Sequence, residues 1–267
     1  MATLRRIFVY PIKSLDAKSV DTATIVENGG LDGDRQFALF DAQGRYVNGK
    51  RNRDTHRLRS TVDFERETVR LDPPEGEART FSLDGDELTD WLSTSFGEPV
   101  SLGRERAGGF PDDTDASGPT IISTATIREL ASWYPGIGAE SMRRRLRPNL
   151  EVDGVPPFWE DRLFAGRDEV VAFTVGDDES GEKVTFEGVN PCQRCVVPSR
   201  DPDTGEEYGG FRERFVEKRR ETMPEWSGGD WFDHHFRVMV NTRVDEADWG
   251  ETLSVGDEVA IEETKSV

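Results

Sequence analysis

Short apolar runs separated by turn residues dominate the first eighty residues, and this spacing is the feature that most constrains the fold. The runs cover residues 3–10, 22–26, 35–40, 57–64 and 68–71. Pro11 follows the first run, Gly30 lies after the second and Gly44 after the third, and these residue types are typical of turns. Such short runs with such punctuation predict strands rather than helices. We therefore expect the chain to begin with a small β-barrel or sandwich.

A helix and a glycine-rich stretch follow the predicted strands. The apolar positions of the helix are Leu88, Trp91, Leu92 and Phe96, which recur at helical spacing. Asp84 and Glu87 have the spacing of a capping box at its start, and Gly97 is placed to end it. Residues 107–118 are rich in Gly and Asp, which predicts a domain boundary or a loop.

The second half of the chain alternates predicted strands with helices. The strands are expected at 150–152, 170–175, 184–189, 236–240 and 259–261. A helix capped at Ser123 or Thr124 has an amphipathic pattern, and further helices are expected at 141–146 and 211–220. The predicted fold class is therefore mixed and mainly β (α+β): an N-terminal β-barrel or sandwich with one helix, then a second β-rich unit with peripheral helices.

The charge of the chain excludes some classes of partner. It has 53 acidic and 34 basic residues, a net charge of -19, and only six lysines. An acidic surface poor in lysine is typical of a protein kept soluble in concentrated salt, where salt screens the self-repulsion. An ordinary acidic cytosolic protein is the alternative. Either way, this charge argues against binding to nucleic acid or to an anionic membrane.

Both cysteines lie in one motif, Cys192-Gln193-Arg194-Cys195. A zinc site needs two further ligands, and the few histidines are poorly placed for it. A redox dithiol usually lies at a helix N-terminus, whereas residues 196–198 are interpreted as strand. The two cysteines could also be buried and purely structural. We favour a single cysteine that acts as a metal ligand, although the spacing alone does not decide between these possibilities. A disulfide between two cysteines three residues apart could not stabilise a fold of this size, and we find no signal peptide. We therefore expect a reduced, cytoplasmic protein.

Four basic residues lie at the ends of predicted elements, close to two serines. They are Lys13, Arg35, Arg147 and Arg194, with Ser14 and Ser117. Arginine suits bidentate phosphate binding and lysine supplies a compact charge, so the group predicts an anionic ligand. We interpret the run 143–145, three successive arginines, mainly as a solvated face that offsets nearby acids.

Several motifs occur in a fixed order along the chain. They are Tyr10-Pro11-Ile12-Lys13-Ser14, Gly33-Asp34-Arg35, Arg147-Pro148-Asn149, Cys192-Gln193-Arg194-Cys195 and Asp201-Pro202-Asp203-Thr204-Gly205. This order resembles MOSC-domain proteins, relatives of the molybdenum cofactor sulfurase C-terminal domain that carry an N-terminal β-barrel. The resemblance implies an N-terminal barrel-like domain at 1–106, a MOSC β-barrel that binds molybdenum cofactor at 107–262 and a tail at 263–267. Residues 157–161 also resemble the family's aromatic-Glu-Asp segment.

The resemblance implies a role for each matching residue. Cys195 matches the cysteine that ligates molybdenum and is therefore the expected metal ligand and catalytic residue. The expected ligands of the molybdopterin are Lys13, Ser14, Arg35, Arg147, Gln193 and Arg194, with Asp115 and Ser117 in a further cofactor loop. His235 stands where close relatives have a tyrosine near the metal, and we expect it, or Asp233, to act as an acid.

The resemblance is greatest to the mitochondrial amidoxime-reducing component and implies a molybdenum cofactor-dependent oxidoreductase. Its expected substrates are small N-hydroxylated or related N–O compounds. The cofactor would supply the redox chemistry, and the protein would supply binding and orientation. Because the chain has only two cysteines and we find no dinucleotide-binding motif, we expect a separate electron carrier, a ferredoxin or a haem protein. The alternative is a carrier of the cofactor or of cysteine-bound sulfur.

Overall fold

The computed structural model describes residues 1–176, 183–227, 231 and 234–267. The described strands are β1 Ala2–Val9, β2 Lys18–Val20, β3 Thr22–Thr24, β4 Phe37–Asp41, β5 Arg59–Asp63, β6 Thr68–Asp72, β7 Arg79–Ser82, β8 Val100–Arg104, β9 Ile121–Ser123, β10 Leu150–Asp153, β11 Glu169–Gly176, β12 Lys183–Gln193, β13 Arg237–Val244, β14 Thr252–Ser254 and β15 Glu258–Ser266. The described helices are α1 Asp86–Phe96, α2 Thr124–Ser132, α3 Ala139–Leu146 and α4 Phe211–Thr222. The mixed, mainly β fold class is confirmed.

Seven of these strands close into a β-barrel. Their order is β10-β9-β13-β12-β11-β15-β1, and β1 pairs with β10 to complete the ring. Strands β9 and β10 run parallel, whereas the other pairs are antiparallel. Side chains alternate across a strand, so apolar residues at every second position fill the interior. Phe173 and Phe186 face each other there with their ring centroids 5.3 Å apart.

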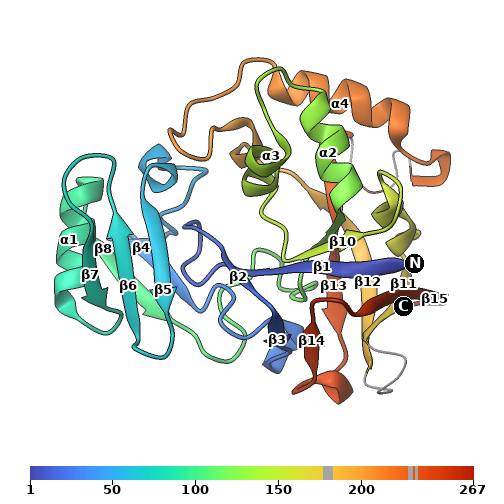
Figure 1. Cartoon of the computed structure of the whole chain (residues 1–267), viewed down its shortest axis with the longest axis horizontal. Coiled ribbons are helices and arrows are strands. Elements are labelled where there is room, and N and C mark those ends of the chain that lie inside the picture. Colours follow the sequence, from blue (N-terminus) through green and yellow to red (C-terminus); the bar gives the residue numbers. More distant parts are fainter. Residues whose placement is uncertain (177–182, 228–230, 232–233) are drawn as a thin grey trace.

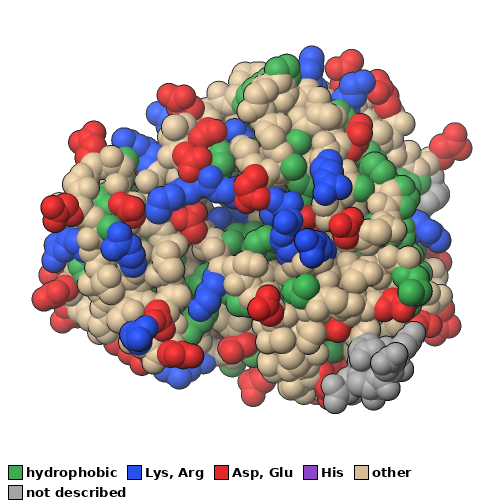
Figure 2. Space-filling model, in the orientation of Figure 1, with side chains coloured by type: hydrophobic (Ala, Val, Ile, Leu, Met, Phe, Trp, Pro, Cys, Tyr) green, Lys and Arg blue, Asp and Glu red, His purple; other side chains and the backbone are tan. Residues whose placement is uncertain are grey.

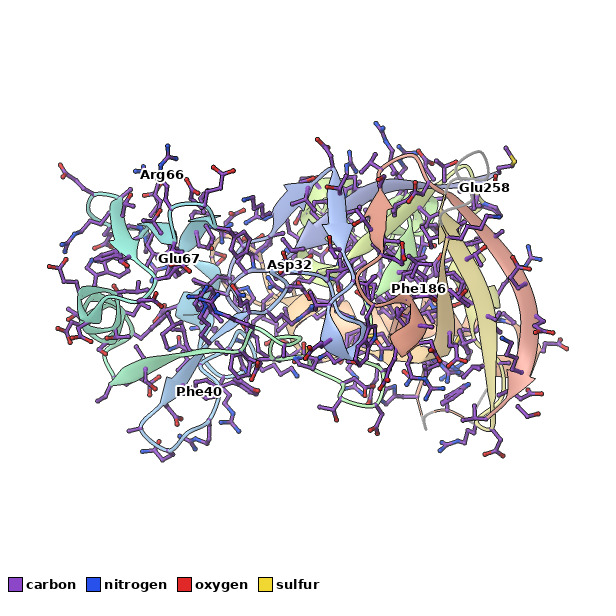
Figure 3. All side chains as sticks on the ribbon, turned by 90° about the horizontal axis from the view of Figure 1, so that it is seen from below. Asp32, Phe40, Arg66, Glu67, Phe186 and Glu258 are labelled. Carbon is purple, nitrogen blue, oxygen red and sulfur yellow. The ribbon has the colours of Figure 1, made fainter. Side chains whose placement is uncertain are left out.

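The first half of the chain contributes to the barrel and also forms a smaller unit. β1 is a barrel strand, and β3 pairs with β14 of the second half. Residues after β3 form a three-stranded sheet of β5, β6 and β7, a β4–β8 pair and helix α1. Their shared core includes Phe37, Leu39, Leu71 and Leu88. Figure 1 shows this unit on the left and the barrel on the right, and Figure 3 shows the two joined at a narrower middle.

Three helices cover one side of the barrel (Figure 1). Helices α2 and α3 form the connection between the parallel strands β9 and β10, and α4 packs in the same apolar cluster. Ser123 caps α2, as expected, because its hydroxyl accepts a hydrogen bond from the backbone N–H of Thr126 at 3.0 Å. α3 ends at Leu146 because Arg147 adopts a left-handed backbone conformation. α4, the longest described helix, has 12 residues, and none of the described helices has the length and apolar character of a membrane span.

Three local expectations from the sequence were wrong. Asp84 does not cap α1, because its carboxylate lies 3.4 Å from Arg104 and the N-cap position belongs to Gly85. The end of the chain is not a loose tail, because β15 continues to Ser266 and pairs with the start of β11. Residues after the cysteine motif are not strand: Val197–Ser199 form one turn of 3-10 helix, which Pro198 favours at its start.

Candidate functional site

A cleft of about 1180 Å³ opens between the N-terminal unit and the barrel. In Figure 2, Lys and Arg side chains gather around a hollow in the middle of the molecule, while acidic side chains are spread over the whole of the face shown. Among the described residues, eleven Lys or Arg and six Asp or Glu line the cleft. The whole chain has the opposite balance, 34 basic to 53 acidic residues. The cleft is thus a basic region on an acidic protein and suits an anionic ligand.

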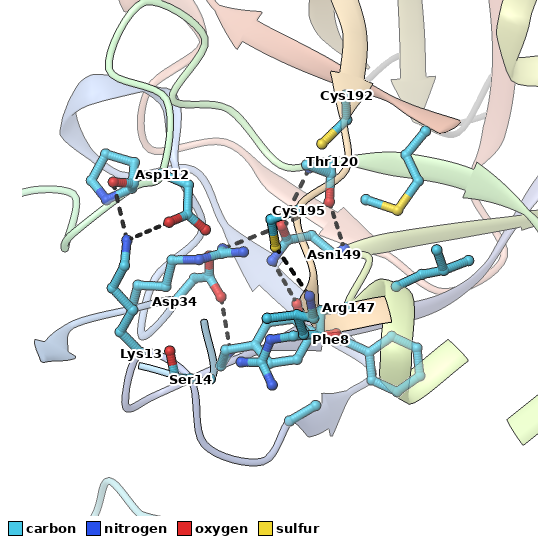
Figure 4. A pocket seen from close by; sticks show the side chains of 18 of the residues that line it. Phe8, Lys13, Ser14, Asp34, Asp112, Thr120, Arg147, Asn149, Cys192 and Cys195 are labelled. Atoms are coloured by element: carbon cyan, nitrogen blue, oxygen red, sulfur yellow. Dashed lines mark hydrogen bonds and ion pairs between the residues drawn. The ribbon is translucent and has the colours of Figure 1, made fainter. Parts of the chain in front are cut away.

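Lys13 lies on the loop between β1 and β2 and lines one wall of the cleft (Figure 4). Its ammonium group donates to the carbonyl oxygens of Phe110 and Pro111 at 2.8 and 3.3 Å and pairs with the Asp112 carboxylate at 2.9 Å. The same nitrogen lies 4.7 Å from the centre of the Tyr46 ring. The side chain is only 7% exposed, and this burial lowers the pKa of Lys13 although Asp112 opposes the shift.

Arg35 lies beside Lys13 and is fixed by an adjacent carboxylate. Asp34 accepts hydrogen bonds from the Arg35 guanidinium and, at 2.7 Å, from the backbone N–H of Tyr10. The guanidinium carbon lies 5.4 Å from the centre of the Tyr10 ring. Burial alone would lower the pKa of Arg35, but the Asp34 and Asp112 carboxylates outweigh it and raise the pKa. Arg35 is therefore a fixed, permanent cation at the base of the cleft.

Arg147 approaches the same aromatic ring from the end of α3. Its guanidinium carbon lies 4.1 Å from the centre of the Tyr10 ring, and one of its nitrogens donates to the Leu15 carbonyl at 2.8 Å. Among the described residues it has no carboxylate partner within ion-pair distance. Burial lowers the pKa of Arg147, with Tyr10 opposing and Arg35 adding to the shift. Neighbouring Asn149 joins three elements, since its amide donates to the Phe8 carbonyl at 3.0 Å and accepts from Thr120 at 3.3 Å.

The opposite wall of the cleft carries sulfur (Figure 4). It is built from the end of β12 and the turn after it, with β13 alongside. The Cys192 thiol accepts a hydrogen bond from the Arg194 guanidinium at 3.0 Å, and the same nitrogen lies 3.9 Å from the sulfur of Met239. The Cys195 sulfur accepts only from the backbone N–H of Val197, at 3.5 Å, among the described residues. Both cysteines are free thiols and half-buried.

Unusual backbone conformations also concentrate at the cleft. Seven non-glycine residues of the described chain have a positive φ, and four of them line the cleft. These are Ser14 (76°), Arg35 (50°), Arg147 (57°) and Met239 (73°). Such conformations cost on the order of 1–3 kcal/mol each and persist where the surrounding structure imposes them, commonly at functional sites. The fold therefore holds these side chains in place at some cost in stability.

Most of the residues singled out in the sequence meet in this cleft. They are Lys13, Ser14, Arg35, Ser117, Arg147, Gln193, Arg194 and Cys195. Ser117 donates its hydroxyl to the Asn28 carbonyl. The carboxamide nitrogen of Gln193 lies 2.8 Å from a ring nitrogen of His234.

Asp115 and His235 lie outside the described lining of the cleft. Asp115 is exposed, and its backbone N–H donates to the Asp113 carboxylate at 3.0 Å. The Nδ1 atom of His235 is buried without a hydrogen-bond partner among the described residues. Burial, and then Arg237, lower the pKa of His235, which favours the neutral imidazole. Asp233, the other expected acid, lies outside the described residues.

The arginine run is not the solvated face that we expected from the sequence. Arg143 and Arg145 are 7% and 3% exposed. Arg143 binds the fully buried carboxylate of Glu151 at 2.5 and 3.0 Å. Arg145 donates to the Pro198 carbonyl at 3.2 Å and pairs with Asp201 at 3.1 Å. The run therefore ties α3 to the barrel and to the segment that follows the cysteines.

Some cleft residues had no signal in the sequence. Asp112 lies in the Gly- and Asp-rich stretch that was interpreted as a domain boundary or a loop. Lys50 and its neighbour Gly49 lie on a loop of the N-terminal unit, where the Gly49 carbonyl accepts a hydrogen bond from Arg200 at 2.6 Å. Asp34 and Asn149 did lie within the motifs, but the pattern gave them no role. Their roles depend on tertiary contacts that local spacing does not encode.

The fold and the cleft together define a two-part protein with a β-barrel and a basic, cysteine-bearing cleft, and the comparison with protein families agrees with this fold. Residues 1–97 match the MOSC N-terminal beta barrel domain, and residues 118–260 match the MOSC domain. The chain belongs to the MOSC domain family. It is also 23% identical over 245 residues to molybdenum cofactor sulfurase 2 of Culex quinquefasciatus, an alignment that covers 76% of this chain. The chain spans only 30% of that relative's length.

Proposed function

We propose that this protein is a molybdenum cofactor-dependent oxidoreductase that reduces N-hydroxylated or related N–O compounds. The observation that carries the proposal is the half-buried thiol of Cys195 in a basic cleft where Arg147 and Arg194 have no carboxylate partner among the described residues. A thiol suits a soft metal, and unpaired guanidinium groups suit the anionic part of the same ligand. MOSC family membership supports this combination.

The residues present fit a pterin that carries a phosphate and a metal. Lys13, Ser14 and Arg35 would hold the phosphate, Arg147 would contact the pterin, and Cys195 would supply the protein ligand to molybdenum. The cleft volume of about 1180 Å³ is larger than most small-ligand pockets, so a cofactor and a small substrate can share it. When bound, the cofactor supplies two-electron redox chemistry.

The surrounding chain orients the groups that the cofactor would meet. The Val197 N–H donates to the Cys195 sulfur at 3.5 Å and so helps to fix the position of this side chain. Arg194 is tied to the Leu146 carbonyl at 2.8 Å and to Cys192, so it holds the first cysteine of the motif in place. Arg35 and Arg147 share the Tyr10 ring, and the Tyr10 hydroxyl donates to the Pro148 carbonyl at 2.9 Å.

Turnover needs electrons from outside the chain. Two cysteines cannot hold an iron–sulfur cluster and also supply the metal ligand, so we propose a ferredoxin or a haem protein as the donor. We expect the loaded protein to be inactive with NADH or NADPH alone and active with a chemical reductant. Activity with NADH as the sole donor would overturn this account of the electron supply.

The test starts with protein purified from its native host. Molybdenum and pterin are measured per mole of chain, and reduction of a simple amidoxime is then followed with a chemical electron donor. We expect both components to be present in equal amounts and the amidoxime to be reduced. Loaded protein that fails to reduce it, even with the chemical donor, would reject the oxidoreductase.

A second candidate is a carrier that holds molybdenum cofactor or cysteine-bound sulfur for delivery to other proteins. The observation that favours it is the similarity to a protein named molybdenum cofactor sulfurase 2. Cys195 would be needed for either function. Transfer of cofactor from the loaded protein to a cofactor-free molybdenum enzyme, without turnover of N–O compounds, would support the carrier.

A further inference from the structure

Every donor of the Lys13 ammonium group already has a partner. An ammonium group has three N–H donors. They face the carbonyl oxygens of Phe110 and Pro111 and the carboxylate of Asp112, at 2.8, 3.3 and 2.9 Å. A phosphate that binds Lys13 must therefore take the place of one of these three groups.

Asp112 is the one partner that can leave without a change in the backbone. The Phe110 carbonyl is held in place because the N–H of the same residue donates to the Arg35 carbonyl at 2.9 Å. The Pro111 carbonyl also belongs to the backbone, so its removal from Lys13 would need a change in backbone torsion angles. The Asp112 side chain is 63% exposed, whereas that of Lys13 is 7% exposed. Rotation of the Asp112 side chain would return its carboxylate to water and leave the ammonium group buried.

Several cations converge on the Asp112 carboxylate. Although partial burial acts in the opposite direction, Lys13, then Arg35 and then Lys50 hold the pKa of Asp112 well below its usual range. The carboxylate is thus ionised, and it occupies the point where the positive charges of this wall meet. Figure 4 shows Asp112 facing Lys13, with Asp34 close by.

We propose that Asp112 is an intramolecular competitor that occupies the phosphate position in the cofactor-free protein and is displaced when the cofactor binds. This proposal rests on the proposed function only for the identity of the ligand, a phosphate monoester. Such a group carries about -1.5 to -2 charges at neutral pH, against one for the carboxylate. The exchange therefore increases the negative charge beside buried Lys13, while weakly bound anions fail to displace Asp112.

The test uses the full-length chain from a host that cannot make the pterin, with inorganic phosphate as the probe. Phosphate affinity is measured at pH 8 by calorimetry and by the rise in melting temperature, with KCl added to keep the ionic strength constant. The variant is Asp112→Asn. The matched control is Asp113→Asn, which removes the same charge from the next residue of the cleft wall. Its amide oxygen can still accept from the backbone N–H groups of Asp115 and Ala116, now at 3.0 and 3.2 Å.

We expect Asp112→Asn to bind phosphate about tenfold more tightly than the unmodified protein, and Asp113→Asn to change affinity by less than about threefold. Without phosphate, Asp112→Asn should melt at a lower temperature than the unmodified protein, because buried Lys13 has lost its anion. Added phosphate should remove this difference in melting temperature. Equal affinities in all three proteins, equal gains in both variants, weaker binding by Asp112→Asn, or no response to phosphate would each overturn the proposal. The measurement involves no metal and no electrons, so failure of N–O reduction would leave it intact.

Discussion

Arg143 and Arg147 lie four residues apart at the end of α3, and they differ in their charged partners. Arg143 is bound to Glu151, a carboxylate with no solvent exposure, whereas Arg147 has an aromatic ring and a backbone carbonyl but no carboxylate among the described residues. A buried arginine whose charge is balanced holds the fold together. One that is left unbalanced beside a cleft is available to a ligand. We therefore expect the partner of each arginine to decide whether it is structural or available to a ligand.

The same difference separates other neighbours in this chain. Cys192 receives a guanidinium hydrogen bond, whereas Cys195 receives only a backbone N–H among the described residues. Both carboxylate oxygens of Asp161 accept from one terminal nitrogen of Arg219, at 2.9 and 3.0 Å. The adjacent Glu160 accepts from the Thr126 hydroxyl at 3.0 Å and has no cationic partner among the described residues. In each case the less saturated member is the one for which we expect a ligand or a proton.

The largest expected effect distinguishes the two cysteines. Cys195→Ser should abolish molybdenum retention, because it removes the only thiol that matches the metal-ligand position. Cys192→Ser should retain most of the metal, because Arg194 keeps its bond to the Leu146 carbonyl. Metal analysis of both proteins, purified in parallel from a cofactor-producing host, is the measurement. Equal loss from both variants would indicate a shared dithiol site and would break the comparison.

Arg143→Gln is expected to destabilise the fold by about 3 kcal/mol, because it leaves a buried carboxylate without its main partner. This loss of stability is at the lower end of the range for breaking a buried ion pair, because Arg6 and Thr124 still contact Glu151 at 3.1 and 2.8 Å. Urea unfolding of the cofactor-free protein measures it. The control is Arg144→Gln, which removes a more exposed ion pair with Asp203. We expect it to lower the free energy of unfolding by less than about 1 kcal/mol. Similar losses in both variants would contradict a special role for the buried pair.

A smaller effect is expected from Glu160 and depends on pH. Burial, and then the neighbouring Asp161, raise the pKa of Glu160 from 4.5 to about 7. Between these values the folded chain binds a proton that the unfolded chain releases, so this contribution to stability is complete below about pH 4.5 and is lost as the pH rises to about 7. We expect a loss on the order of 2 kcal/mol across this window. Glu160→Gln should lack this part of the slope, as unfolding at pH 5 and pH 8 would show; equal slopes in both proteins would reject the assignment.

The sequence was sufficient where local rules decide the structure. Gly97 ends α1 in a left-handed conformation, and Ser123 caps α2. Most motif residues also meet in one cleft, as expected from the basic residues at element ends and from the order of the motifs. The sequence was insufficient where a partner comes from elsewhere in the fold. Nothing in the run 143–145 shows that Glu151 is fully buried beside it, and nothing near residue 112 shows that Lys13 needs an anion.

The smallest expected effect tests the other member of the arginine pair. Arg147→Gln removes a partly buried charge whose pKa is already lowered, so the free energy of unfolding should change by no more than about 1 kcal/mol. The pterin recovered per mole of purified chain should fall about tenfold, equivalent to about 1.4 kcal/mol of binding free energy. Arg144→Gln, three residues earlier, should retain its pterin.

The comparison of Arg143 with Arg147 holds only if Arg147→Gln loses pterin while its free energy of unfolding stays nearly unchanged. If Arg147→Gln unfolded as easily as Arg143→Gln and kept its pterin, the contacts to Tyr10 and Leu15 would be its whole role, and an absent carboxylate would not identify a ligand-binding arginine. If pterin is lost while stability is kept, the charge is used by the ligand. In that case the charge of Arg147, whose pKa burial lowers, would be balanced by the anionic part of the bound cofactor and not by a carboxylate of the chain.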